Sequence, residues 1–121
     1  MAVEKTVAKQ TTGATIRGFT QESSNGQTTY EVATVINGHT KDIQINADGI
    51  VLEVEEQVDL KSLPATAQTA LAKKAGKGKI TKVESLTKKS RLVAYEAQVS
   101  ASGKLSEIQV GPAGESLDHE E

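Results

Sequence analysis

Short segments of this chain alternate between apolar and polar residues, a pattern that predicts β-strands with one buried and one open side. The dipeptides Asn37-Gly38 and Ser102-Gly103 separate such segments and predict two-residue hairpin turns. We expect the apolar sides to form a core beneath helices. These sides carry Tyr30, Val32, Ile36, Ile43, Ile45 and Leu52, and later Tyr95, Ala97, Ala101, Ile108, Val110 and Leu117.

Two other segments carry apolar residues at helical spacing. The clearer one begins at Leu63-Pro64 and ends at Gly76, since proline suits a first turn and glycine a helix end. The other runs from about Ala2 to Gln10. Their apolar stripes are mostly alanine, so we expect a thin core and modest stability.

The two halves of the chain resemble each other. At an offset of 65 residues, YEVATVINGHTKDIQINADGIVLEVEE, starting at Tyr30, aligns with YEAQVSASGKLSEIQVGPAGESLDHEE, starting at Tyr95. The alignment predicts two tandem repeats, residues 1–57 and 58–121, that together make one compact domain. The predicted fold class is α+β: two helix-plus-four-strand repeats that form one antiparallel sheet with both helices packed on one face.

The open side of the predicted strands is acidic and amide-rich at four paired positions. These are Glu31, Asp42, Gln44 and Glu53 in the first repeat, and Glu96, Glu107, Gln109 and Asp118 in the second. A polar open face is ordinary for an exposed antiparallel sheet, and the alternative is a surface for a protein or peptide partner.

The position of Phe19 and of its counterpart Val83 is open, because each follows an isoleucine by three residues. Either a bulge turns both side chains toward the core, or they point to the open face. On the open face Phe19 would be an apolar anchor for a partner.

Composition excludes several classes of function. A net charge of −2 and only three aromatic residues do not suit a nucleic-acid binder, which needs a basic groove and stacking rings. No apolar run approaches the roughly 20 residues of a membrane-spanning helix. Cysteine is absent, and His39 and His119 lack a histidine partner at metal-binding spacing, so we expect no metal and no cofactor.

We also expect no enzymatic activity. Acid–base catalysis by paired carboxylates needs a concave, partly desolvated site, and a flat solvated sheet does not provide one. Calcium binding is a fairer alternative, but EF-hand spacing is absent and a solvated turn is the better explanation of the segment. The acidic residues of that segment are Asp48, Glu53, Glu55, Glu56 and Asp59.

The chain contains an alanine-rich helix that begins with LP in LPATAQTAL, the segment ITKVE, an alternating segment that begins with YE, and a DG turn. Together these features resemble the PepSY-like domains. These domains are related in fold to the β-lactamase-inhibitor proteins, and the resemblance covers nearly the whole chain twice. It implies an exported bacterial protein, periplasmic or secreted, and supplies no catalytic residues. The sequence departs from the pattern in VGPAG, which replaces a second DG turn, and in its few aromatic residues.

The resemblance and the open face lead to three hypotheses. The first is an exported, non-enzymatic binding or inhibitory module whose partner is a protein or peptide with a basic surface. The second is a structural or assembly module of the cell envelope that pairs through strand edges, and the third is a weak calcium-binding envelope protein. We expect a monomer or weak homodimer. We also expect a longer natural N-terminus that carries an export signal in place of Met1, because the counterpart of Leu63-Pro64 is missing.

Overall fold

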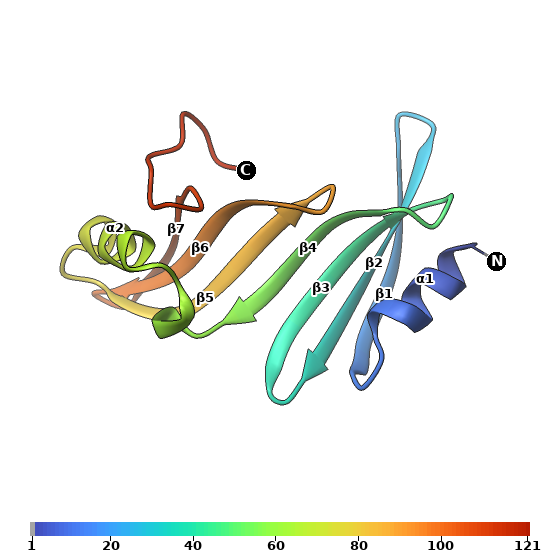
Figure 1. Ribbon diagram of the computed structural model, residues 1–121, viewed down its shortest axis with the longest axis horizontal. Coiled ribbons are helices and arrows are strands. Elements are labelled where there is room, and N and C mark those ends of the chain that lie inside the picture. Colours follow the sequence, from blue (N-terminus) through green and yellow to red (C-terminus); the bar gives the residue numbers. More distant parts are fainter. Residues whose placement is uncertain (1) are drawn as a thin grey trace. The chain divides into compact units, whose positions relative to one another are not determined.

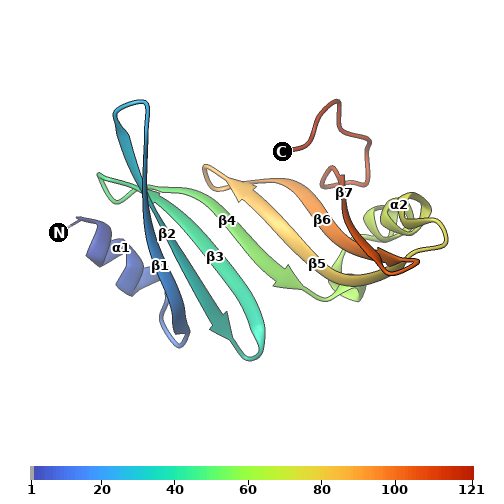
Figure 2. The same cartoon turned by 180° about the vertical axis from the view of Figure 1, so that it is seen from behind.

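The structure is a computed structural model that describes residues 2–121 (Figure 1), so the expectation about Met1 lies outside its described part. Figure 2 shows the same chain from behind. The elements are α1 (Ala2–Gln10), β1 (Thr15–Ser24), β2 (Gln27–Ile36), β3 (His39–Asn46), β4 (Val51–Val58), η1 (Leu60–Ser62), α2 (Ala65–Ala75), β5 (Lys79–Lys88), β6 (Arg91–Ala101) and β7 (Lys104–Val110). The strands form one seven-stranded sheet in the order β1-β2-β3-β4-β5-β6-β7.

The predicted fold class is wrong. The described chain is mostly β, a single antiparallel sheet of seven strands with only two short helices, and not two helix-plus-four-strand repeats. The expected last strand is missing, because residues 111–121 contain no strand.

Local hydrogen bonds explain the missing strand. The N–H of Gly111 donates to the carbonyl of Glu115 at 2.8 Å, and the N–H of Gly114 donates to the carbonyl of Gly111 at 2.9 Å. The N–H of Ala113 donates to the Glu115 carboxylate at 2.9 Å. Pro112 has no N–H at all. The amides of this segment are therefore used locally and do not form a ladder with β7.

The predicted helices and turns are confirmed individually. Helix α1 has the expected bounds, and α2 lies between Pro64 and Gly76. The hairpin turns have positive φ at both central residues, 51° and 82° at Asn37-Gly38 and 51° and 78° at Ser102-Gly103. These angles are those of the type I′ turn expected for such dipeptides.

The chain divides into two compact units, which are described separately. Unit 1 contains the residues up to Glu56 together with Thr87–Arg91. Unit 2 contains Gln57–Leu86 and Leu92–Glu121.

The core of unit 1 is small and lies between α1 and the sheet. Its buried residues are Val3 of α1 with Val32, Ile43 and Ile45. Leu52 does not belong to this core, contrary to the sequence-based expectation. The register shifts between Gln44 and Ile45, so that Val51 lies opposite Ile45 and Val54 opposite Ile43. Val51 and Val54 therefore pack on the core in its place.

The core of unit 2 is formed by α2 and the strands beside it. Its buried residues are Leu63, Ala67, Leu71, Val83, Ala97 and Val110. Leu117, expected here from the alternation, lies in the irregular segment after β7.

A turn glycine contacts the first turn of the helix in each unit. Gly49 has a φ of +85°, and a Cβ added to it would lie 2.7 Å from the carbonyl oxygen of Ala2. The Thr6 hydroxyl also donates to the carbonyl of Gly49. In unit 2, Gly114 has a φ of +88°, and a Cβ added to it would lie even closer to the carbonyl oxygen of Thr66. Both turns therefore need glycine for backbone conformation and for space.

Candidate functional site

The strand register of unit 1 brings acidic side chains into neighbouring rows. Glu31 on β2 lies opposite Gln44 on β3, and Gln44 lies opposite Glu53 on β4. In the next row Asp42 lies opposite Glu55. Directly opposed residues share a side of a sheet, and this side is opposite to that of Val32 and Ile43 in the core.

These side chains surround a shallow hollow of about 70 Å³. Its lining residues are Glu31, Asp42, Ile43, Gln44, Glu53 and Glu55, so the described residues around it supply four carboxylates and no lysine or arginine. A water occupies roughly 30 Å³, and ligand pockets usually measure about 300–1,000 Å³. The hollow therefore fits one small cationic head group and is too small for a typical substrate.

Glu55 is the residue of this site that sequence reasoning missed. Its acidic neighbours in the sequence suggested only a calcium segment, although Glu55 lies two residues after Glu53 on the same strand. The two-residue period of a strand puts both on one face, and this period was the available signal.

In unit 2 the predicted open-face residues interact with one another. The side-chain amide of Gln109 donates to the Glu96 carboxylate at 2.8 Å, and the backbone N–H of Glu121 donates to Gln109 Oε1 at 2.8 Å. Gln109 is buried, with 6% exposure. Asp118 is not on a strand, because it lies in the irregular segment after β7. Gln109 is therefore held by Glu96 and by the C-terminal segment, whereas Glu107 and Asp118 are exposed.

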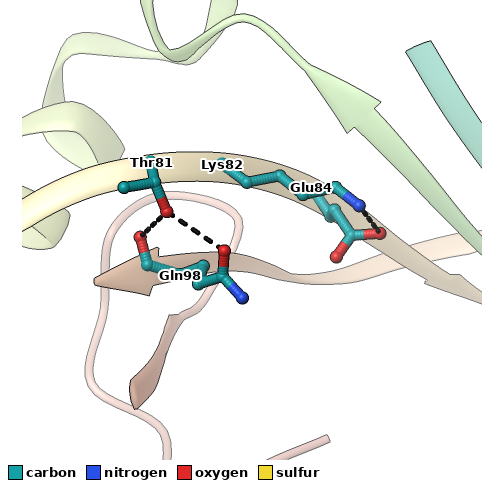
Figure 3. Close-up of polar contacts among 4 residues, drawn as sticks. All are labelled: Thr81, Lys82, Glu84 and Gln98. Atoms are coloured by element: carbon teal, nitrogen blue, oxygen red, sulfur yellow. Dashed lines mark hydrogen bonds and ion pairs between the residues drawn. The ribbon is translucent and has the colours of Figure 1, made fainter. Parts of the chain in front are cut away.

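The carboxylates of unit 2 also repel one another. The charge of Glu96, together with a hydrogen bond to it, raises the pKa of Glu107 above its ordinary value of 4.5; burial and the charges of Glu84 and Glu120 raise it further. Glu84 has a cation beside it, because Lys82 Nζ lies 4.0 Å from its carboxylate (Figure 3).

Figure 3 also shows how β5 and β6 are linked by a side-chain contact. The Thr81 hydroxyl lies 3.1 Å from Gln98 Oε1 and 3.3 Å from the Gln98 carbonyl. Gln98 lies opposite Glu107 on β7, so this contact orders the strand next to the crowded carboxylates.

The structure decides the two alternatives for Phe19 and Val83. The register of β1 and β2 shifts between Ile16 and Gly18, which is the bulge that the first alternative requires. Phe19 then lies opposite Val32 and shares its side, which is the core side and not that of Glu31. Its ring centroid is 5.8 Å from that of Tyr30, yet 53% of Phe19 is exposed. Val83 is 4% exposed and belongs to the core of unit 2.

The described residues contain no group of three acidic, histidine or cysteine side chains placed to hold a metal ion. No helix in the described part of the chain is long and apolar enough to cross a membrane.

No protein-family model matches this sequence, and no curated protein matches it. Among solved structures, the chain is similar to a BLIP-like protein of Bacteroides fragilis NCTC 9343. The identity is 18% and the TM-score 0.67, with 96% of this chain and 81% of that chain covered. The fold is BLIP-like.

Two further structures support this fold. A protein of Bacteroides eggerthii DSM 20697, provisionally described as periplasmic, has 19% identity and a TM-score of 0.74, covering 96% of this chain and 84% of that one. A DUF2874 family protein of Bacteroides ovatus ATCC 8483 has 19% identity and a TM-score of 0.72, covering 97% and 83%. Likeness at these identities establishes the fold alone, and the PepSY-like family stays a prediction.

Proposed function

We propose that this chain is an exported, non-enzymatic binding module that contacts a protein or peptide partner with a basic surface. The primary contact residues are Glu31, Asp42, Gln44, Glu53 and Glu55 around the hollow of unit 1, which we call the acidic hollow. Glu96, Glu107, Gln109 and Asp118 of unit 2 form a second contact region, in which Glu107 and Asp118 are exposed and Gln109 is buried beneath the C-terminal segment.

The observation that carries this proposal is the acidic hollow itself. The four carboxylates of Glu31, Asp42, Glu53 and Glu55 line a space of about 70 Å³. A lysine or arginine of a partner would form charge-assisted hydrogen bonds there. Complementary charges of this kind mainly set the association rate and the choice of partner.

The fold and its neighbours support the cellular part of the proposal. A BLIP-like protein and a protein provisionally described as periplasmic share this fold, and neither description names an enzyme. We therefore place this chain in the periplasm or outside the cell, with inhibition of a basic partner as one form of binding.

The experiment compares the wild type with the variant Glu31→Lys/Glu53→Lys. Both proteins are immobilised and exposed to a periplasmic extract at about 0.1 M and about 1 M salt, where the Debye length is about 10 Å and about 3 Å. Each captured protein is then purified and its Kd measured by calorimetry. The matched control is Glu4→Lys/Asp48→Lys, which makes the same change in net charge at residues outside the hollow.

We expect a basic partner whose affinity falls in the hollow variant and at high salt but is retained by the control. Equal losses in the two variants would show that net charge alone matters and would refute the site. The absence of any partner that binds as a purified protein would refute the function.

A further inference from the structure

Strand β1 is an outer strand of the sheet, and its register is with β2 alone. Nine of its ten residues are exposed. Both views show the β1–β2 hairpin at the end of the sheet, with its tip projecting past the neighbouring strand β3 (Figures 1 and 2). An outer strand of this kind presents a row of backbone donors and acceptors to any extended chain.

The turn that joins β1 to β2 determines which backbone groups face outward. Asn25 and Gly26 have φ of 53° and 77°, so the hairpin closes with a type I′ turn. Such a turn makes its flanking residues, Ser24 and Gln27, the hydrogen-bonded pair, and bonded and non-bonded pairs then alternate along the strands. The register has no shift between Gly18 and Ser24. The backbone N–H and C=O of Phe19, Gln21 and Ser23 therefore point away from β2.

The other outer strand, β7, is covered at its end near Gln109, whereas its exposed first four residues include the charged Lys104 and Glu107. Lys74 Nζ donates to the backbone carbonyl of Gln109 at 2.9 Å, and the N–H of Glu121 donates to the side chain of Gln109 at 2.8 Å. Charged residues on an edge and a covering segment are two devices that prevent edge pairing. Between the bulge and the turn, β1 has neither a covering segment nor a proline or lysine, and its single charge there is Glu22.

The two sides of this edge differ in chemistry. On the core side, Phe19 is half-exposed and its ring contacts Tyr30, which itself packs on the core of unit 1. On the opposite side are Thr20 and Glu22, and Thr20 lies opposite Glu31 of the acidic hollow. An added strand would therefore place its side chains alternately on the side of Phe19 and on the side of Glu22, with Tyr30 and Glu31 one strand further away.

We propose that β1 binds an extended peptide of alternating apolar and basic residues, which adds as a new outer strand along Gly18–Ser24. The proposal rests on the proposed function, because the basic side chains of the peptide lie on the side of the acidic hollow. Backbone hydrogen bonds to Phe19, Gln21 and Ser23 hold the peptide, and the alternation selects it.

The test uses the capped peptide acetyl-Lys-Val-Lys-Val-Lys-Val-Lys-amide and a control peptide of the same composition with the valines in one block. Gln21→Pro removes an outward N–H without removing a bond to β2, a change that outer strands tolerate. Gln21→Val is the matched control, since it changes the side chain and keeps the N–H. Glu31→Lys/Glu53→Lys tests the acidic hollow in the same titration.

We expect the alternating peptide to bind more tightly than the block peptide. Gln21→Pro should weaken binding by about tenfold, the loss expected for one or two backbone hydrogen bonds, whereas Gln21→Val should bind like the wild type. In the wild type, hydrogen exchange measured by NMR should slow at the amides of Phe19, Gln21 and Ser23 and not at those of Thr20 and Glu22.

Three outcomes would overturn the inference. Unchanged binding by Gln21→Pro with loss in the hollow variant would leave the proposed function intact and refute strand addition. Equal binding of the alternating and block peptides to every variant would refute both strand addition and the proposed function. Slowed exchange at the same three amides on raising protein concentration without peptide would show that a second copy of this chain occupies the edge.

Discussion

Gly49 determines how closely α1 packs against the β3–β4 turn, and Gly49→Ala tests this. The φ of +85° is a left-handed conformation that costs an L-residue about 1–2 kcal/mol. The new Cβ would also lie 2.7 Å from the carbonyl oxygen of Ala2 and 3.0 Å from its Cβ, so the first turn of α1 must move. Overpacking of this kind costs about 1–3 kcal/mol. We therefore expect a total loss of about 2–5 kcal/mol in the free energy of unfolding.

Gly38→Ala separates the two contributions. Gly38 has a φ of +82° but no atom within 4 Å of an added Cβ, so it should lose only the backbone contribution of about 1–2 kcal/mol. Both variants are unfolded in urea and followed by circular dichroism and tyrosine fluorescence. In a Tyr95→Phe background, Tyr30 is the only tyrosine and reports on unit 1. Equal losses for the two glycines would refute the claim that α1 packs tightly on the turn.

Three further predictions concern the two cores and the crowded carboxylates. Leu71→Ala removes a fully buried side chain from unit 2 and should cost about 2–5 kcal/mol in urea unfolding; a loss below about 1 kcal/mol would contradict the core assignment. Thr34 is buried and its hydroxyl donates to the carbonyl of Lys41 at 2.8 Å, so Thr34→Val should cost about 0.5–1.5 kcal/mol, with exposed Thr20→Val as the neutral control. The charge of Glu96 is the main cause of the raised pKa of Glu107, so the folded state favours the protonated carboxyl. Protonation of Glu107 therefore stabilises the fold. This contribution is complete below pH 4.5 and is lost as the pH rises through the raised pKa. Glu107→Gln should therefore raise the melting temperature at neutral pH and leave it unchanged well below pH 4.5, whereas an equal increase at both values would contradict the electrostatic cause.

The local elements were predictable because short-range chemistry determines them. Pro64 and Gly76 delimit α2, and Asn37-Gly38 gives the two-residue turn, each from the conformational preference of one or two residues.

The bulges and the C-terminal segment were not predictable from alternation. A bulge adds one residue to a strand and changes which side chains face the core, so alternation alone placed Leu52 in the core where Val51 and Val54 pack. The aligned repeats likewise suggested a last strand. That expectation was wrong because the alignment contains no information about the local hydrogen bonds between Gly111 and Glu115.

The candidate site was partly predictable. The two-residue period places Glu31, Gln44 and Glu53 on one face, and the register then puts them opposite one another. The hydrogen bond from the N–H of Glu121 to Gln109 depends on the path of an irregular segment, which no periodicity encodes.

The order of the strands has a consequence for how the chain folds during synthesis. Each strand neighbours in the sheet the strand that precedes it in sequence, so contacts are short in sequence separation and folding is fast for a β-rich protein. A chain that emerges from a ribosome can add one strand at a time to a growing edge. Helix α1 is the exception, because Val3 has no core to enter until Ile43 and Ile45 have arrived. The first helix made is therefore among the last elements of unit 1 to dock.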